Sequence, residues 1–286
     1  MLKKITHLIY FILSLINKFV ELFSPRFKFL LYLKEYIESK SYIEKKILGK
    51  KVIFFCPNKS TDLRVKRFLS KEPGTLEWIN TFKNSSETSF WDIGSNIGIF
   101  SIYAALVHDK IKIISFEPST SNLRVLSRNI SINNFTENIS ISQIALSPKI
   151  NQNLLFKESR FIEGGASNVF GENFDQYGKN FVSNNSYKVY GTSIDYLIDN
   201  KIYKIPNYIK LDVDGIEHLI LSGADKYLAD KQLQSISVEI NDKFEEQKKK
   251  IFEILKNNNF KLNSTNKSED NPNTRHPHIK NYIFNK

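Results

Sequence analysis

Residues 90–100 read FWDIGSNIGIF, and this stretch decides the fold class. Residues 88–93 predict a short buried strand, and residues 97–107 predict a helix directly after it. Gly94 and Gly98 let the backbone turn sharply off the strand and approach a ligand, and the start of the following helix offers free N–H groups. The stretch therefore predicts a ligand-binding turn between a strand and a helix.

The spacing of the two glycines distinguishes between kinds of ligand. Gly94 and Gly98 form G-x-x-x-G, whereas the dinucleotide fingerprint is G-x-G-x-x-G, whose second glycine makes room for a pyrophosphate. Asn96 takes that middle position, and Asp92 before the turn would repel a pyrophosphate but suit an ammonium group. Glu117 lies 19 residues beyond Gly98, where a carboxylate can accept both ribose hydroxyls of an adenosine. The pattern favours a positively charged nucleoside over NAD.

Strand and helix patterns alternate through the centre of the chain. Further strands are predicted over 110–116, 139–145, 208–213 and 234–240, with closing edge strands at 260–262 and 281–284. Helices are predicted over 119–133, 216–228 and 245–256. This alternation predicts an α/β fold with a mostly parallel sheet of seven strands, covered by helices on both faces.

Two segments fall outside the alternation. Residues 87–286 are assigned to the catalytic domain, and residues 1–86 to an N-terminal helical or accessory region. Within the domain, residues 149–191 contain several glycines among many Asn and Ser residues. Because long loops inside compact domains are usually functional or mobile, we predict a loop excursion that forms a substrate-facing lid or wall.

Composition excludes several classes of protein. The chain has 286 residues, 41% of them hydrophobic, which is enough for one full core. Cys56 is the only cysteine, so internal disulfides and a cysteine-based zinc site are excluded, and a reducing, cytoplasmic location is expected. The formal charge of +11 suits nucleic acid, an anionic membrane or an anionic substrate. Because the lysines are dispersed and no nucleic-acid-binding motif is present, we expect no nucleic acid partner.

The first residues, MLKKITHLIYFILSLINKFVELF, predict an amphipathic helix with a wide apolar face. No small-residue cleavage site follows the apolar run, and Lys18 and Glu21 would fall inside a membrane span, so we expect neither a signal peptide nor a transmembrane helix. The favoured interpretation is a helix packed on its own domain. The alternative is peripheral contact of residues 1–28 with the inner face of an anionic membrane, aided by Lys3, Lys4, Arg26 and Lys28.

Four motifs in order and spacing resemble the FkbM-type methyltransferase family. They are FWDIGSNIGIF at 90–100, ISFEPSTSNLRVLSRNISINN at 114–134, ISQIALS at 141–147 and YIKLDVDGIEHLILSGA at 208–224. The resemblance spans roughly residues 68–241 and implies a Rossmann-like methyltransferase fold with S-adenosylmethionine as cofactor. By this resemblance, the methionine part would lie against Asp92, Gly94, Asn96 and Gly98, the ribose against Glu117, and the adenine edge against Gln143 to Ala145.

Ionisable side chains gather where the predicted fourth strand ends, at KLDVDGIEH, residues 210–218. In the family, the motif with Asp212 and Asp214 borders the methyl-transfer centre. Because a hydroxyl acceptor has to lose a proton, Asp212 is the first candidate to orient or accept it and His218 the second. A surface position for His218, and a simple turn at Asp214, are the structural alternatives.

The fifth strand ends with Glu239 and Asn241, which point to the same crevice or to solvent. Asp212, Asp214 and Glu239 also offer the oxygen ligands of a magnesium site, an alternative that we keep beside a metal-free site.

The expected activity is S-adenosylmethionine-dependent O-methylation of a hydroxyl on a saccharide or related metabolite, within surface polysaccharide biosynthesis. That substrate class comes from the resemblance alone, since a fold does not name a substrate. Two alternatives are an NAD-dependent oxidoreductase on a related sheet and a non-catalytic, membrane-associated interaction protein. The sequence gives no oligomeric state.

Overall fold

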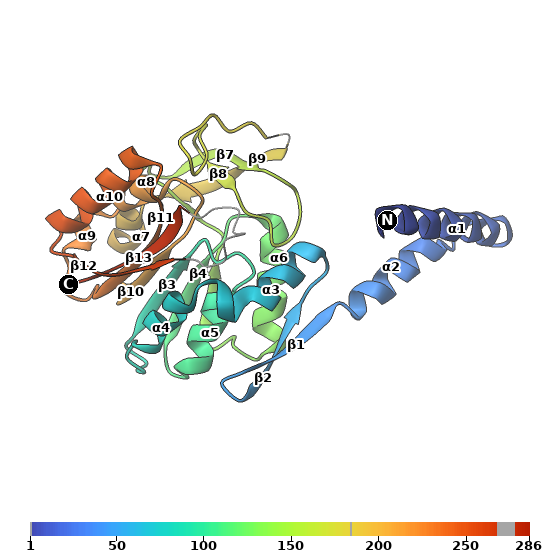
Figure 1. Cartoon of the computed structure of the whole chain (residues 1–286), viewed down its shortest axis with the longest axis horizontal. Coiled ribbons are helices and arrows are strands. Elements are labelled where there is room, and N and C mark those ends of the chain that lie inside the picture. The colour runs from blue at the N-terminus through green and yellow to red at the C-terminus, as the bar shows by residue number, and fades with distance from the viewer. Residues whose placement is uncertain (1, 184, 268–277) are drawn as a thin grey trace.

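The computed structural model describes residues 2–183, 185–267 and 278–286. A rounded α/β body carries a helical arm at its N-terminal end (Figure 1). The body contains the predicted site, whereas the arm stands apart from it.

A seven-stranded sheet with the order β12-β13-β11-β10-β3-β4-β5 forms the centre of the body, as predicted. Its strands are β3 (Ser89–Ile93), β4 (Lys112–Phe116), β5 (Ile139–Ser142), β10 (Tyr208–Leu211), β11 (Ser235–Asn241), β12 (Lys261–Lys267) and β13 (Ile279–Asn285). All neighbouring pairs from β5 to β11 are parallel, and β13 runs antiparallel to both β11 and β12. The strand order reverses beside β3, and ligands of such sheets bind in the crevice beyond the strand ends at that point.

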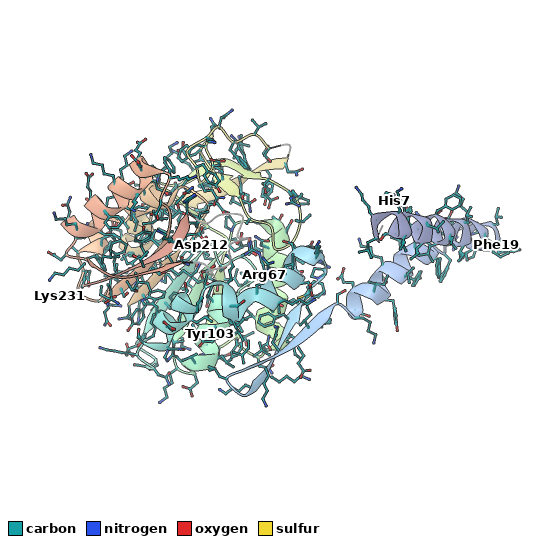
Figure 2. The ribbon with its side chains drawn as sticks, viewed as in Figure 1. His7, Phe19, Arg67, Tyr103, Asp212 and Lys231 are labelled. Carbon is teal, nitrogen blue, oxygen red and sulfur yellow. The ribbon has the colours of Figure 1, made fainter. Side chains whose placement is uncertain are left out.

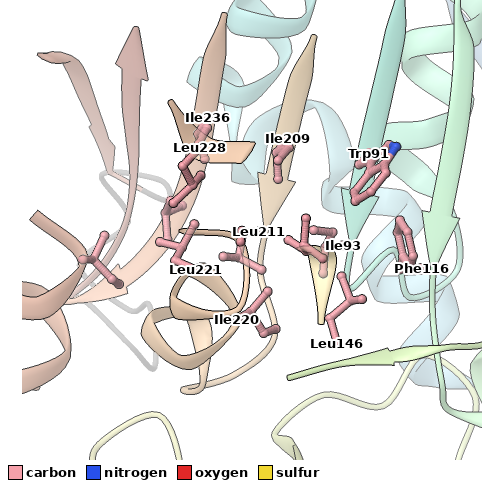
Figure 3. Close-up of a cluster of buried hydrophobic side chains, with 14 of the residues drawn as sticks. Trp91, Ile93, Phe116, Leu146, Ile209, Leu211, Ile220, Leu221, Leu228 and Ile236 are labelled. Atoms are coloured by element: carbon pink, nitrogen blue, oxygen red, sulfur yellow. The ribbon is translucent and has the colours of Figure 1, made fainter. Parts of the chain in front are cut away.

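Helices cover both faces because each central strand is apolar on both sides. Phe90 and Trp91 are fully buried neighbours that point into different clusters. One cluster joins the sheet to α4 (Pro73–Asn80), α5 (Ile99–Val107) and α6 (Thr120–Ile132). The other joins it to α7 (Ile194–Asp199), α8 (Glu217–Ser222), α9 (Asp225–Leu228) and α10 (Glu245–Asn257). Figure 3 shows residues of this second cluster, with Ile236 beside Leu228 at one side and Trp91 beside Phe116 at the other.

Two predicted elements are corrected. The helix expected over 216–228 is divided into α8 and α9 at Gly223, where an added Cβ would lie 2.8 Å from the Ser147 carbonyl oxygen. The strand expected over 139–145 ends at Ser142, and Ala145–Leu146 forms β6 of a different sheet.

The segment 149–191 is not the bare loop that we predicted. It contains β7 (Gln152–Glu158), β8 (Asn168–Phe170) and most of β9 (Asn185–Thr192), which join β6 in a four-stranded sheet with the order β6-β9-β7-β8. Phe156 and Phe170 of this small sheet are buried in the same cluster as Trp91. The small sheet is therefore anchored to the main core, and the described residues 159–167 and 171–183 of this segment remain irregular.

The N-terminal arm consists of α1 (Leu2–Phe23) and α2 (Phe29–Ser39), which lie side by side and project from the body (Figure 1). Neither helix has a buried residue, so the expectation that the first helix packs on its own domain is wrong. By length and composition, α1 is the one helix among the described residues that qualifies to cross a membrane. The argument against a span, from Lys18 and Glu21, stays a prediction.

A hairpin and a further helix connect the arm to the body. The hairpin strands are β1 (Tyr42–Ile47) and β2 (Lys50–Phe55), and α3 (Lys59–Lys71) follows. Phe55 N–H donates to Asn129 Oδ1 at 2.7 Å, and Ile53 N–H donates to Asn133 Oδ1 at 2.8 Å. Asn129 belongs to α6, so residues before 87 are built into the wall of the body.

Candidate functional site

A cavity of about 1020 Å³ opens where β3, β4 and β10 end. Typical ligand pockets enclose about 300–1,000 Å³, so this cavity has room for a nucleoside cofactor and part of an acceptor. Its walls come from α3, the turn after β3, the end of β4, residues 144–146, the β7–β8 loop and the end of β10. The sheet therefore brings several predicted site residues together.

Gly94 forms the floor of the cavity in the turn after β3. Its φ is +83°, and an added Cβ would lie 1.8 Å from the Asp212 carbonyl oxygen. Asn96 lies in the same turn with φ 52° and lines the cavity. Gly98 is at the start of α5 with φ +82°, where an added Cβ would meet Leu126 Cδ1 at 2.4 Å. Gly98 is outside the lining, so it shapes the turn from behind.

Glu117 lines the cavity at the end of β4 and is almost completely buried. Its Oε2 accepts from Asn96 N–H and its Oε1 from Ser119 N–H, both at 2.8 Å. Burial raises the pKa of Glu117 to about 7, against the opposing effect of these hydrogen bonds. Each carboxylate oxygen keeps a further lone pair for a ligand hydroxyl. This geometry fits the ribose role that the resemblance implies.

Asp92 does not line the cavity, although the resemblance places it against the methionine part of the cofactor. It is fully buried in β3, where Ser101 Oγ donates to its Oδ2 at 2.6 Å and its Oδ1 has no partner. Burial raises the pKa of Asp92, while the charge of Lys210 opposes the rise. Asp92 is thus placed to act on the turn and on Lys210 rather than to touch a ligand directly.

An apolar wall lies beside Glu117. Phe116, Pro118, Ile144 and Ala145 line the cavity there, a set that suits a planar purine ring. Gln143 is exposed and outside the lining. Of the predicted adenine edge, the structure therefore brings Ala145 and its neighbour Ile144 to the cavity but leaves Gln143 out.

On the other side of Gly94, three carboxylates approach one another. Oxygens of Glu72, Asp212 and Glu239 lie within 4.8 Å of one another. Lys71 Nζ donates to Glu72 at 2.7 Å, and Lys210 Nζ donates to Asp212 at 2.8 Å. Burial would raise the pKa of Asp212, but Lys210 and Lys71 outweigh it and lower that pKa to about 2. Burial and the charge of Asp212 raise the pKa of Glu239 well above its ordinary value.

This cluster differs from the magnesium set considered from the sequence. Glu72 stands in it where Asp214 was expected. Asp214 Oδ2 instead accepts from Ser167 N–H at 2.7 Å and from Asn168 N–H at 3.3 Å. Burial and the nearby charge of Asp212 raise the pKa of Asp214 to about 6. Because two ammonium groups already compensate the cluster, its residues have less need of a bound cation.

The structure does not bring His218 to the cavity. Its buried ring lies 6.2 Å from the Phe174 ring and 6.1 Å from the Phe244 ring, measured between centroids, and its Nδ1 has no partner. Burial, with a smaller effect of Lys250, lowers its pKa to about 4. Asn241 is also outside the lining, and its Nδ2 donates to the Gln176 carbonyl at 2.9 Å.

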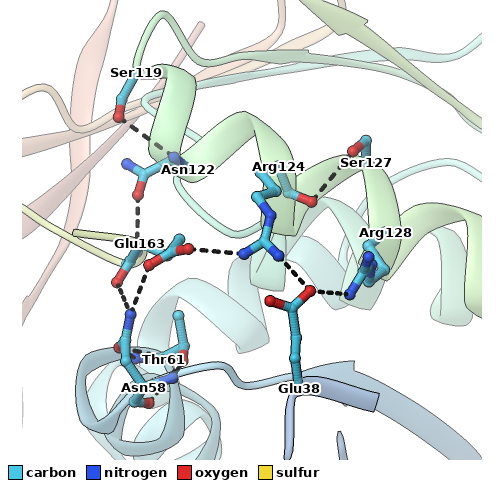
Figure 4. A network of polar contacts seen from close by, with 10 residues as sticks. Glu38, Asn58, Thr61, Ser119, Asn122, Arg124, Ser127, Arg128 and Glu163 are labelled. Atoms are coloured by element: carbon cyan, nitrogen blue, oxygen red, sulfur yellow. Dashed lines mark hydrogen bonds and ion pairs between the residues drawn. The ribbon is translucent and has the colours of Figure 1, made fainter. Parts of the chain in front are cut away.

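The β7–β8 loop, residues 159–167, crosses the cavity. Asn96 Nδ2 donates to the Gly165 carbonyl at 2.6 Å, and Gly164 N–H donates to Asn122 Oδ1 at 2.9 Å. Glu163 of the loop accepts from Arg124 of α6 at 2.8 Å (Figure 4). Arg124 also donates to Glu38 of α2, so one arginine links the loop to the base of the arm. The loop is thereby held over the predicted cofactor half of the cavity.

Helix α3 and Glu72 were not among the predicted site residues, although both contribute to the site. The signal for α3 is local: Asn58 accepts from Ser60 N–H and Thr61 N–H and forms a capping box with Thr61. The signal for Glu72 is absent, because its approach to Asp212 depends on how α3 packs against the sheet.

Comparison with known proteins adds sequence evidence. A family described as "Methyltransferase FkbM domain" matches residues 92–262. The "Methyltransferase sdnD" of Sordaria araneosa is 33% identical over 81 residues, which cover 28% of this chain and 31% of that protein. The chain thus matches less than a third of that relative's length.

Solved structures with a similar arrangement include a methyltransferase FkbM from Methylobacillus flagellatus, with 14% identity and a TM-score of 0.45 over 78% of this chain and 53% of that one. TYW2 of M. jannaschii, solved in complex with AdoMet, has 12% identity and a TM-score of 0.42 over 86% of this chain and 87% of that one.

Proposed function

Because the chain belongs to the FkbM methyltransferase family and uses S-adenosylmethionine as cofactor, we propose that it methylates a hydroxyl oxygen of a saccharide or related metabolite. The family assignment replaces the alternative of an NAD-dependent oxidoreductase. A role in surface polysaccharide biosynthesis is part of the proposal and rests on the resemblance.

The observation that carries the proposal is one cavity with two chemically different ends. Glu117 and the apolar wall of Phe116 and Ile144 form one end, which suits an adenosine. Asp212 and Glu239 form the other, and Gly94 lies between the two. When bound, S-adenosylmethionine supplies a methyl group on a positively charged sulfur. The carboxylates at the second end would then face that charge and an acceptor hydroxyl.

The chain's own residues provide alignment and a path for the proton. Asp212, with its low pKa, remains ionised and would accept a hydrogen bond from the acceptor O–H, which fixes the direction of attack. Asp214 also lines the cavity, and its pKa of about 6 is closer to that of an effective proton acceptor. The β7–β8 loop lines the cavity and would keep water from the reacting atoms.

Methyl transfer from radiolabelled S-adenosylmethionine to a saccharide pool, followed by mass spectrometry of the product, tests this function. Wild-type protein should place the label on a saccharide oxygen. Asp212→Asn should lower kcat by about 10²-fold or more, as expected for a lost general-base or orienting group. Asp225→Asn, at an exposed position on α9, is the matched control and should keep full activity. Label on nitrogen or carbon, or equal activity of the two variants, would contradict the proposal.

We also propose that α1 holds the enzyme at the inner, anionic face of a membrane. Large apolar side chains of α1 are exposed, among them Leu8, Phe11 and Phe19. Lys3 and Lys4 near the start of α1 could pair with anionic headgroups. The full chain should sediment with anionic vesicles, and a Leu8→Glu, Phe19→Glu double variant should stay in the supernatant. Equal sedimentation of both proteins would contradict this location.

A further inference from the structure

Helix α3 turns a basic face toward the cavity. Its cavity-lining residues follow helical spacing and are Lys59, Ser60, Leu63, Arg64, Arg67 and Lys71. Its opposite face buries Val65 and Phe68 in the core. The rotation of α3 is therefore fixed by packing, and the basic side chains are directed to the cavity. Figure 2 shows Arg67 and Asp212 near the centre of the body, and both line the same cavity.

A further arginine reaches this face from the β7–β8 loop. Arg160 lines the cavity from that loop. Arg64 Nε donates to the Gly164 carbonyl at 2.7 Å, and Ser60 Oγ donates to the same oxygen at 2.9 Å. An added Cβ on Gly164 would meet Thr61 Cγ2 at 2.9 Å, so the loop packs closely on α3. The loop that carries Arg160 is thereby fixed against α3, the helix that carries Arg67.

Among the described residues, two of these positive charges are not compensated by an acid. In the part of the chain that the structure describes, neither Arg67 nor Arg160 forms an ion pair with a carboxylate. Glu163, the acid of the β7–β8 loop, is bound by Arg124 at 2.8 Å. Glu72 is bound by Lys71 at 2.7 Å. Both guanidinium groups are exposed at the cavity wall, so they are available to a negative partner from outside the chain.

The cofactor supplies only one negative group for these two arginines. S-adenosylmethionine has a single carboxylate and carries positive charge on its sulfur and its amine, so two unpaired arginines exceed what it requires. We infer that the acceptor carries a phosphate or diphosphate group, which Arg67 and Arg160 bind while its hydroxyl faces Asp212. Guanidinium groups bind phosphate oxygens through paired, charge-assisted hydrogen bonds. This inference rests on the proposed function and specifies the acceptor as a phosphorylated saccharide.

Binding of inorganic pyrophosphate to the full-length protein, first saturated with S-adenosylhomocysteine, tests the inference by calorimetry. Pyrophosphate should bind, and Arg67→Gln and Arg160→Gln should each weaken it about tenfold, the effect of one lost charge-assisted contact. Lys231→Gln is the control, because Lys231 is exposed and far from the cavity (Figure 2). This variant should leave the affinities for pyrophosphate and for S-adenosylhomocysteine unchanged. S-adenosylhomocysteine should bind all four proteins equally.

The outcomes separate this inference from the proposed function. Absence of S-adenosylhomocysteine binding would overturn the proposed function itself. If that ligand binds but pyrophosphate does not, or if Lys231→Gln weakens pyrophosphate as much as the arginine variants do, only the inference fails. A parallel loss of S-adenosylhomocysteine affinity in the arginine variants would assign the arginines to the cofactor carboxylate and overturn it as well.

Competition then identifies the source of the phosphate. A soluble nucleoside diphosphate and vesicles that contain a polyprenyl diphosphate are each added to the pyrophosphate complex. Displacement by either one supports the inference and identifies a nucleotide-linked or a lipid-linked acceptor. Displacement by neither contradicts it.

Discussion

Lys210 Nζ donates to Asp212 Oδ2 at 2.8 Å from a side chain that is only 2% exposed. The ammonium also lies 4.8 Å from the centre of the Phe100 ring. Burial lowers the pKa of Lys210, but the negative charges of Asp212, Asp92 and Glu72 outweigh burial. They raise that pKa above its ordinary value and keep the lysine protonated. A buried cation on β10 thus sets the charge of the carboxylate that faces the proposed acceptor.

Lys210→Met should lower the free energy of unfolding by roughly 3–5 kcal/mol, because buried carboxylates would lose their counter-ion. Urea unfolding measures the change. Lys226→Met removes an exposed pair with Asp199 and should leave stability nearly unchanged. Equal losses of unfolding free energy in the two variants would show that the buried Lys210–Asp212 pair stabilises the fold no more than the exposed pair does.

Gly94→Ala should weaken cofactor binding by more than the strain of its positive φ alone would cause. Gly94 and Gly49 have φ of +83° and +79°, so Ala at either position costs about 1–2 kcal/mol of strain. Only at Gly94 does an added Cβ meet backbone, since nothing lies within 4 Å at Gly49. We expect Gly49→Ala to bind S-adenosylmethionine normally and Gly94→Ala to lose binding or fail to fold. Normal binding by Gly94→Ala would contradict the close approach of β3 and β10.

Glu117→Gln should change how stability depends on pH. Because burial raises the pKa of Glu117 to about 7 from an ordinary 4.5, the folded state binds more protons than the unfolded state between these values. Wild-type protein therefore loses stability from this group as pH rises from 4.5 to 7, and the glutamine variant does not. The stability of the variant relative to wild type should rise by about 3 kcal/mol over that interval. Parallel pH curves from urea unfolding would exclude the raised pKa.

His218→Phe should keep kcat and KM within about twofold of wild type, whereas loss of a true general base costs about 10²–10⁴-fold. The ring of His218 lies among Phe174 and Phe244 and outside the cavity, so a phenyl ring suits its surroundings. A loss of two orders of magnitude in steady-state assays would restore the direct role for His218 that the sequence suggested.

The sequence predicts the main sheet well because buried parallel strands are short apolar runs that need no partner to be recognised. Phe90 to Ile93 and Tyr208 to Leu211 are such runs, each interrupted by one buried charged residue, Asp92 or Lys210. The small sheet is harder to predict. Its β7 reads QNLLFKE, and its register with β9 pairs Gln152 with Gly191, far along the chain. Non-local pairing of this kind leaves little local pattern.

Site residues are predictable where the same segment forms a strand end and bears the side chains that face the ligand. Gly94, Asn96 and Glu117 lie at strand ends, so topology alone brings them to the crevice. Which face of a helix meets the cavity depends instead on packing. The sequence therefore predicts His218 at the site and does not predict Arg67, and the approach of Glu72 to Asp212 depends on how α3 packs against the sheet.

Calorimetric titration with S-adenosylmethionine tests the central claim most directly. At pH 8, above the pKa of about 7 of Glu117, wild-type protein should bind the cofactor. Glu117→Gln should bind at least about tenfold more weakly because a charged hydrogen-bond acceptor is lost, and the exposed control Glu137→Gln should match wild type. No binding by wild type, or undiminished binding by Glu117→Gln, would contradict the account.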